Sequence, residues 1–160
     1  MKKIYLLILS FCIITLAIAQ DGEFHLDKNY KVSKNGTIDL GASDARVFIT
    51  GSNRADAHVK IDRKVTIKGW YTEKGEFTVD VEQADGNLRI REREHGVNGG
   101  IVSYYKEEYK IETEAPEGVS LKIRGDDGDY YIKNINGAIS MSIDDADAEL
   151  VNCNGDSFTF

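Results

Sequence analysis

The chain has 160 residues with 27 acidic and 20 basic side chains, which gives a net charge of −7 at neutral pH. This acidic balance argues against a nucleic-acid-binding protein, because contacts to phosphates need clustered lysine and arginine. The length is that of one domain, and two cysteines are too few for a disulfide-rich scaffold.

Residues 1–19 have the pattern of a cleaved export signal. Lys2 and Lys3 precede an almost unbroken apolar stretch from Ile4 to Ile18, and Ala17-Ile18-Ala19 is the small-x-small pattern that signal peptidase reads. The stretch of about 15 residues is shorter than the roughly 20 that a membrane-spanning helix needs. An uncleaved N-terminal anchor is therefore the weaker interpretation.

Cleavage after Ala19 would leave a mature domain of residues 20–160. Its net charge is −9, with 18 basic and 27 acidic residues, so a partner bound through charge is expected to be a cation or a basic surface. Cys12 leaves with the signal and Cys153 remains alone, so no internal disulfide is expected. No later segment is long and apolar enough to span a membrane. The expected location is the periplasm, the outer cell surface or the extracellular space.

After Gln20, period-2 alternation of apolar residues dominates and helical periodicity is rare. The alternating runs are short and bounded by Gly, Asn, Asp or Ser, as expected for strands joined by turns. An all-β domain is predicted. The runs are Ile38-Leu40, Val47-Ile49, Val59-Ile61, Val65-Ile67, Phe77-Val79-Val81, Leu88-Ile90, Val119-Leu121-Ile123 and Tyr130-Ile132.

The middle of the chain is less regular. Phe77 to Ile111 is interpreted as longer paired strands with a glycine-rich connection, projecting from the rest. Arg89, Arg91 and Arg93 alternate with other residues, so they share one strand face, which could bind an anionic glycan. Ion pairs with neighbours such as Glu107 and Glu108 would explain the same pattern.

From Asp127 the chain divides into nine-residue units. The units read DGDYYIKNI, NGAISMSID, DADAELVNC and, incompletely, NGDSFTF. Asn or Asp opens each unit and Gly usually follows, a pair typical of turns because both tolerate positive φ. Apolar residues recur two and four places after the glycine position. A third column, seven places after it, holds Ile135 and Cys153 but is broken by Asp144.

One strand and one corner fit into nine residues. Such a unit cannot bury its apolar side alone, but stacked units share a continuous core, so the fixed spacing favours a single-stranded β-helix or solenoid-like stack. A meander of hairpins with two-residue turns is the alternative. The number of strands in each coil stays open.

Two stretches carry a resemblance to a known family. The first is Ala45-Arg46-Val47-Phe48-Ile49-Thr50-Gly51 with Val59-Lys60-Ile61. The second begins at Pro116-Glu117-Gly118-Val119-Ser120-Leu121 and continues through the Gly128-Asp129, Asn136-Gly137 and Asn154-Gly155-Asp156 steps. Together they resemble the bacterial exported β-repeat domains labelled "putative adhesin". The resemblance implies a β-solenoid in a cell-envelope setting and brings no functional residues with it. Such domains run through further repeats, whereas this chain stops at Phe160 just after a unit begins, which suggests a truncated stack.

Two acidic corners are the candidate metal site. They lie 18 residues apart, and if two strands make one coil they stack with carboxylates about 5 Å apart. A Ca²⁺ ion between them would relieve the repulsion, although aspartate also serves turn positions and solubility without any ion. No other cofactor is expected. The residues of the two corners are Asp126, Asp127, Asp129, Asp144, Asp145 and Asp147.

Aromatic pairs and single histidines complete the candidate residues. Trp70-Tyr71, Tyr104-Tyr105 and Tyr130-Tyr131 each place one ring inward and one outward in a strand, and Trp70 with Tyr71 is the candidate ligand contact. The histidines, His25, His58 and His95, have no nearby companion and are read as solvated. Cys153 is read as a small buried apolar residue.

These observations predict a non-enzymatic envelope protein, an adhesin or surface scaffold that binds envelope or surface proteins or glycans. Open end strands would also allow end-to-end β-strand association. The first alternative is a periplasmic sensing module of an envelope-stress system. The second, a glycan-active β-helix enzyme, is disfavoured because too few coils exist to form a deep groove.

Overall fold

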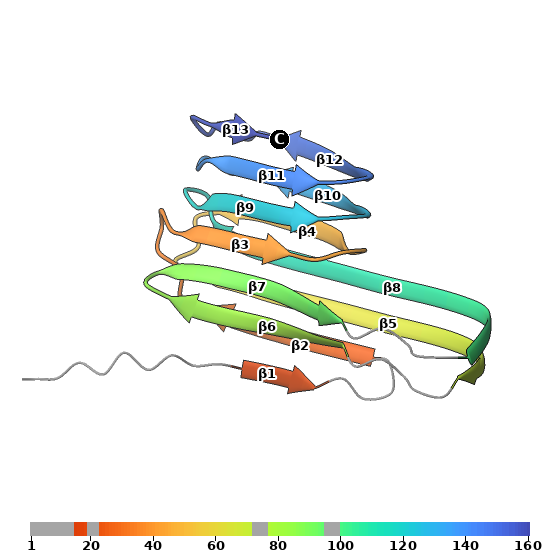
Figure 1. Cartoon of the computed structure of the whole chain (residues 1–160). Coiled ribbons are helices and arrows are strands. Elements are labelled where there is room, and N and C mark those ends of the chain that lie inside the picture. The colour runs from red at the N-terminus through yellow and green to blue at the C-terminus, as the bar shows by residue number, and fades with distance from the viewer. Residues whose placement is uncertain (1–14, 19–22, 72–76, 95–99) are drawn as a thin grey trace, which may run out of the picture.

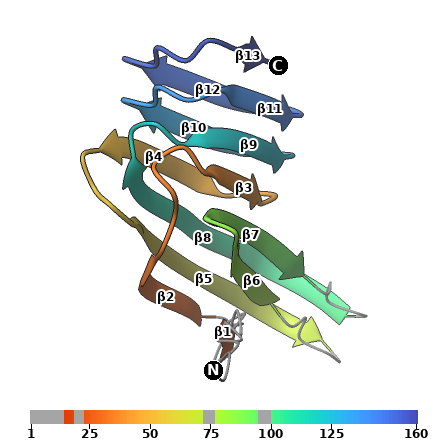
Figure 2. The ribbon, with the colours of Figure 1, turned by 90° about the vertical axis from the view of Figure 1, so that its left-hand side faces the viewer.

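The computed structural model describes residues 15–18, 23–71, 77–94 and 100–160. Throughout these residues the chain forms β-strands and turns and contains no helix, so the predicted all-β class is confirmed. The strands form two mixed sheets that face each other (Figures 1 and 2).

The first sheet has seven strands. Its two antiparallel pairs, β1–β6 and β6–β7, lie at one end, and the pairs from β7 to β13 are parallel. The strands in spatial order are β1 (Thr15–Ile18), β6 (Phe77–Ala84), β7 (Asn87–Glu94), β3 (Thr37–Gly41), β9 (Ser120–Gly125), β11 (Ile139–Ile143) and β13 (Phe158–Thr159).

The second sheet has six strands. It is antiparallel from β2 to β8 and parallel from β8 to β12. The strands in spatial order are β12 (Ala146–Val151), β10 (Gly128–Lys133), β4 (Arg46–Ser52), β8 (Gly100–Pro116), β5 (Ala57–Tyr71) and β2 (Glu23–Tyr30).

The parallel part advances by 18 residues from one strand to the next in the same sheet. Leu121 pairs with Ile139 in the first sheet, and Gly128 pairs with Ala146 in the second. Two nine-residue units therefore make one turn of the chain, one strand in each sheet. This explains why Asp144 breaks the third apolar column, because alternate units place that position at opposite ends of the strands.

The chain order of the stack differs from its spatial order. β3 lies between β7 and β9, and β4 lies between β8 and β10. Residues 37–52 are thus inserted between segments that follow them in sequence by some 50 to 80 positions, as shown by the pairing of Ile38 with both Leu88 and Leu121. Local sequence patterns contain no signal for this insertion.

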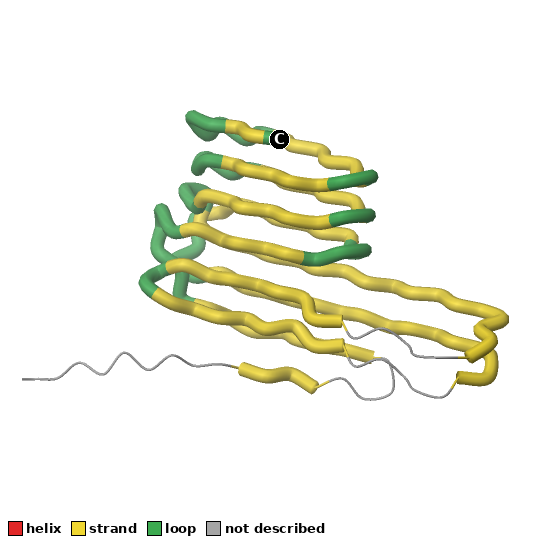
Figure 3. Tube along the Cα trace, in the orientation of Figure 1, coloured by secondary structure: helices red, strands yellow, loops and turns green. Residues whose placement is uncertain are grey.

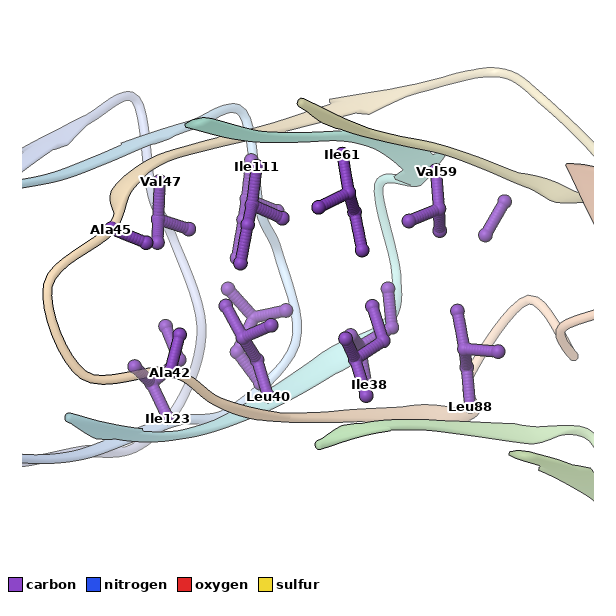
Figure 4. Packing of buried hydrophobic residues seen from close by; sticks show 14 of the residues in the cluster. Ile38, Leu40, Ala42, Ala45, Val47, Val59, Ile61, Leu88, Ile111 and Ile123 are labelled. Atoms are coloured by element: carbon purple, nitrogen blue, oxygen red, sulfur yellow. The ribbon is translucent and has the colours of Figure 1, made fainter. Parts of the chain in front are cut away.

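The core fills the space between the sheets. Figure 4 shows Ile38 and Leu40 of one sheet pointing toward Ile61 and Val47 of the other. All four are at most 1 % exposed, and full burial of such a side chain contributes about 1.5–3 kcal/mol. Because side chains of a strand alternate between its two faces, the intervening polar residues form the outer faces.

The corner glycines serve close packing rather than positive φ. A Cβ at Gly137 would lie 2.1 Å from the carbonyl oxygen of Val119, and one at Gly155 would lie 2.0 Å from that of Gly137. The only glycine with positive φ in the described residues is Gly86, at 76°. The expectation that the Asn-Gly pairs of the repeat use positive φ is therefore wrong for these glycines.

Asparagines at the end of alternate units adopt the left-handed conformation instead. Asn134 and Asn152 have φ of 57° and 53° and lie 18 residues apart. The Nδ2 of Asn152 donates a 3.4 Å hydrogen bond to the Oδ1 of Asn134. A stacked pair of asparagines thus forms this corner, and Figure 3 shows such turns aligned along the stack.

The central strands form two antiparallel pairs in different sheets. Asp85 and Gly86, both with positive φ, make the two-residue turn between β6 and β7. β5 and β8 pair from His58–Glu114 to Tyr71–Gly100 and extend past the other strands (Figure 1). The predicted projection of long paired strands is confirmed. The pairing partners differ from the prediction, because β7 and β8 lie in opposite sheets.

β1 falls inside the predicted export signal. Thr15–Ile18 pairs antiparallel with Thr78–Val81 of β6. The basic start of the signal and Ala19 lie outside the described residues, so cleavage stays a prediction. Among the residues that were described, none belongs to a helix long and apolar enough to cross a membrane.

Candidate binding surface

The outer face of the first sheet carries a cluster of cations. On β7, Leu88 and Ile90 point into the core, so the alternation directs Arg89, Arg91 and Arg93 outward. On β9 the same alternation directs Lys122 and Arg124 outward. We call this surface the arginine face, and it consists of Arg89, Arg91, Arg93, Lys122 and Arg124 with the carboxylates Asp39, Asp80 and Glu82.

Asp39 on β3 lies at the centre of the arginine face. Its backbone register places it opposite Arg89 on one side and Lys122 on the other. Its carboxylate accepts from Arg91 Nη2 at 2.6 Å and from Arg124 Nη2 at 2.9 Å. Arg89 Nε lies 3.7 Å away. Three guanidinium groups from two neighbouring strands therefore converge on one carboxylate whose side chain is only 16 % exposed.

The remaining carboxylates lie toward β6. Asp80 pairs with Arg93, and Glu82 lies 3.9 Å from Arg89. The arginine face thus has five cations and three carboxylates, a surplus of two positive charges on a chain whose net charge is −7. It holds four of the seven arginines in the sequence.

A glycine provides the space in which Arg91 lies across the sheet. A Cβ at Gly41 would come within 2.9 Å of Arg91 Nη1 and 3.3 Å of its Cδ. Beside it is an open pocket of about 590 Å³ between the ends of β3, β9 and β11. Arg91 and Arg124 line the pocket together with Glu92, Ser43 and Ser142. Glu92 is held by Ser43, whose hydroxyl donates at 2.7 Å.

The sequence located part of this surface. The prediction that Arg89, Arg91 and Arg93 share one strand face agrees with their printed contacts, all of which are to outward residues of the same sheet. The suggested partners Glu107 and Glu108 are wrong, because β8 lies in the other sheet. Asp39 and Arg124 were missed, and only their positions in alternating strands could have indicated an outward direction.

The predicted acidic corners are neighbours in the structure. Asp129 pairs with Asp147, and Gly128 pairs with Ala146, so the two corners lie at the same end of adjacent strands. A third corner precedes β4, where Asp44 stands two residues before Arg46, the pairing partner of Asp129. Within the described residues no group of three or more His, Cys, Asp or Glu side chains has metal-binding geometry. The calcium site stays a prediction.

The aromatic candidates have separate environments. Trp70 and Tyr71 end β5, opposite Ile101 and Gly100, but their side chains lie outside the described residues. Tyr130 is 1 % exposed while Tyr131 is 40 % exposed, as the alternation predicted. Tyr131 stacks on Phe48 of β4 at 4.9 Å between ring centroids, a contact between neighbouring strands that stabilises the sheet.

Two of the histidines bind aspartates on the outer face of the second sheet. His25 Nδ1 lies 2.6 Å from Asp62, and His58 Nε2 lies 2.8 Å from Asp27. The hydrogen bond from His58 lowers the pKa of the Asp27 carboxyl. His95 is outside the described residues.

Cys153 is partly buried against the core, as predicted.

Two buried phenols have hydroxyls without a hydrogen-bond partner among the described residues. They belong to Tyr109 of β8 and Tyr130 of β10. Burial raises the pKa of both, that of Tyr130 to about 12, with further contributions from the charges of Asp126 and Glu92. Neither hydroxyl lies on the arginine face.

Comparisons with known proteins give distant likenesses in structure. No protein-family profile and no curated protein matches the sequence. A "putative cell adhesion protein" from Clostridium sporogenes matches with a TM-score of 0.49 and 13% identity over 91% of this chain and 64% of that one. A "putative adhesin" from Parabacteroides distasonis has 0.30 and 12% over 81% and 57%, and a "putative lipid binding protein" from the same organism has 0.30 and 12% over 81% and 60%. The chain thus spans less than two thirds of the length of these three proteins, and at such values the likenesses assign no function to it.

Proposed function

We propose that the chain is a non-enzymatic, exported envelope protein that binds other surface components through the outer faces of its sheets, as an adhesin or surface scaffold does. The observation that supports this most is the arginine face, where cations are concentrated on one side of an acidic chain. Charge collected on a flat surface serves to attract and orient a charged partner.

We also infer that the parallel part is a β-solenoid with two strands in each coil. The 18-residue registers of β9 with β11 and of β10 with β12 support this. Stacked coils repeat their outward side chains about every 4.8 Å, so a repetitive ligand can be bound at several points at once. Such multivalent binding suits a surface protein whose single contacts are weak.

Export is the second part of the proposal. Its support is the sequence of residues 1–19, and the mature domain would be residues 20–160. Removal of the signal would also remove β1, leaving β6 as an edge strand of the first sheet.

The proposal is tested by expressing the full chain with its own N-terminus and isolating the exported product. Its N-terminal residue and its co-sedimentation with purified envelope fragments would be measured, with vesicles of neutral phospholipid as a control. We expect Gln20 as the first residue and saturable binding to the envelope fragments. Retention of Met1 in the cytoplasm, or equal sedimentation with the neutral vesicles, would contradict the proposal.

A further inference from the structure

We propose that the arginine face binds an acidic polysaccharide, a chain of sugars bearing carboxylate or sulfate groups. This inference rests on the proposed function, because it names the ligand class of the same surface. It departs from the charge of the whole chain, which favours a basic partner.

The first argument is the excess of hydrogen-bond donors around Asp39. A guanidinium has five N–H donors and no acceptor, and Asp39 offers two oxygens to the three groups that converge on it. One carboxylate cannot neutralise three cations held this close together. Unused donors are therefore left for an external anion, and Arg124 and Arg89 are 43 % and 59 % exposed.

The second argument is the extent of the cluster. Alternate residues of a strand are spaced by about 6.8 Å, so Arg89 and Arg93 on β7 are separated by about 13.6 Å. Arg124 lies two strands away from β7, at about 9.6 Å across the sheet. Cations spread over such an area fit a polymer with regularly repeated anionic groups better than one small anion.

The third argument is the polarity of the neighbouring positions. The outward residues of β9 and β11 include Ser120, Ser140 and Ser142, whose hydroxyls match the hydroxyls of sugar rings in bonding capacity. No aromatic side chain points outward from β3, β7, β9 or β11. A single-stranded nucleic acid would need aromatic rings on which to stack its bases, so the surface favours a polysaccharide.

The experiment measures binding of the purified full chain to heparin and to polygalacturonate, with neutral dextran and single-stranded DNA for comparison. Heparin carries sulfates, polygalacturonate carries carboxylates, and the assay is run at physiological and at raised salt. We expect binding to at least one of the two acidic polysaccharides that weakens with salt, and no binding to dextran.

The key variant is Arg91→Gln with Arg124→Gln. Its matched control is Lys60→Gln with Lys110→Gln, which removes the same charge from the outer face of the second sheet. We expect the arginine variant to lose at least about tenfold in affinity and the lysine variant to stay within about twofold, because charged hydrogen bonds are lost only in the former. Since removal of Arg91 could disturb folding, the more exposed pair Arg89→Gln with Arg93→Gln is measured as well, beside thermal melts of each variant.

Three results would overturn the inference. They are equal losses in the arginine and lysine variants, no binding of the parent chain to either acidic polysaccharide, and DNA binding as tight as that of the polysaccharides. If envelope binding survives in both arginine variants, this inference fails while the proposed function stands. If the parent chain binds neither envelope fragments nor polysaccharides, both fail.

Discussion

Asp39 and Arg91 form a 2.6 Å ion pair across the parallel strands β3 and β7, two strands that lie some 50 residues apart in sequence. Since Arg124 binds the same carboxylate from β9, Asp39 links three neighbouring strands on their outer face. The same residue therefore holds the inserted strand β3 in place and fixes the positions of the guanidinium groups.

Replacement of Asp39 by Asn should separate these two roles. Loss of the shared negative charge leaves three guanidinium groups in mutual repulsion, so we expect the free energy of unfolding to fall by about 1–2 kcal/mol. Affinity for heparin should rise, because the internal competitor for the guanidinium groups is gone. Denaturant titration and a heparin-binding isotherm check the two effects. An unchanged free energy of unfolding would mean that the ion pairs with Asp39 contribute nothing to the fold.

Gly137→Ala should strongly destabilise the stack. The new Cβ would lie 2.1 Å from the carbonyl oxygen of Val119 and 2.5 Å from its carbon, so the backbone of one coil must move away from the next. We expect a loss of about 1–3 kcal/mol, the usual range for overpacking. Ser140→Ala, at an exposed position three residues later, is the control and should change the thermal midpoint little. Similar midpoints for both variants would contradict the close approach at this corner.

Tyr130→Phe should be neutral or slightly stabilising at neutral pH, because it removes a buried hydroxyl without a described partner. Its effect should appear in alkali. An unfolded tyrosine ionises near its ordinary pKa of 10.0, whereas burial first, and then nearby carboxylates, raise the pKa of Tyr130 to about 12. The unfolded state therefore releases its proton first, and stability falls as pH rises from 10 towards 12.

In the Tyr130→Phe variant this part of the alkaline loss should disappear. Urea titrations at a series of alkaline pH values, with tyrosinate absorbance as the monitor, measure it. Tyr131→Phe, on the exposed side of the same strand, is the control. Equal pH dependence in parent and Tyr130→Phe would show that the phenol titrates normally in the folded state.

The acidic corners give a prediction about metal. If Ca²⁺ binds between Asp126 and Asp144 or their neighbours, saturating Ca²⁺ should raise the thermal midpoint by a few degrees over that in chelator, since the ion binds only the folded state. Asp126→Asn with Asp144→Asn should abolish the difference, and Mg²⁺ should replace Ca²⁺ poorly because it demands stricter geometry. Superimposable melts with Ca²⁺ and with chelator would leave the aspartates as turn and surface residues.

Much of the strand pattern was readable because it depends on local alternation. Leu88 and Ile90 predict both a strand and its buried side, and the nine-residue spacing from Asp127 predicted stacked units. The doubling to 18 was less accessible, because two half-units differ only in which end of the strand their last residue reaches. Ile135 and Asp144 show this difference as an apparent fault in the repeat.

The binding surface was only partly predictable, for a reason of topology. Arg89, Arg91 and Arg93 share a face by strand periodicity alone, but Asp39 reaches them only because β3 is inserted beside β7. Net charge misled in the same way, since a sum over the chain does not show that two opposite faces divide the charges unequally.

The parallel registers also limit how the length of this fold can vary. A strand in the first sheet recurs only after a full passage through the second, so the unit of growth is 18 residues. An insertion of nine at a corner such as Asn134 would send every later strand to the opposite sheet, exchanging the serine-lined surface of β11 for the acidic one of β12. Length in this part of the molecule is therefore quantised, and duplications of whole coils are the changes that conserve both surfaces.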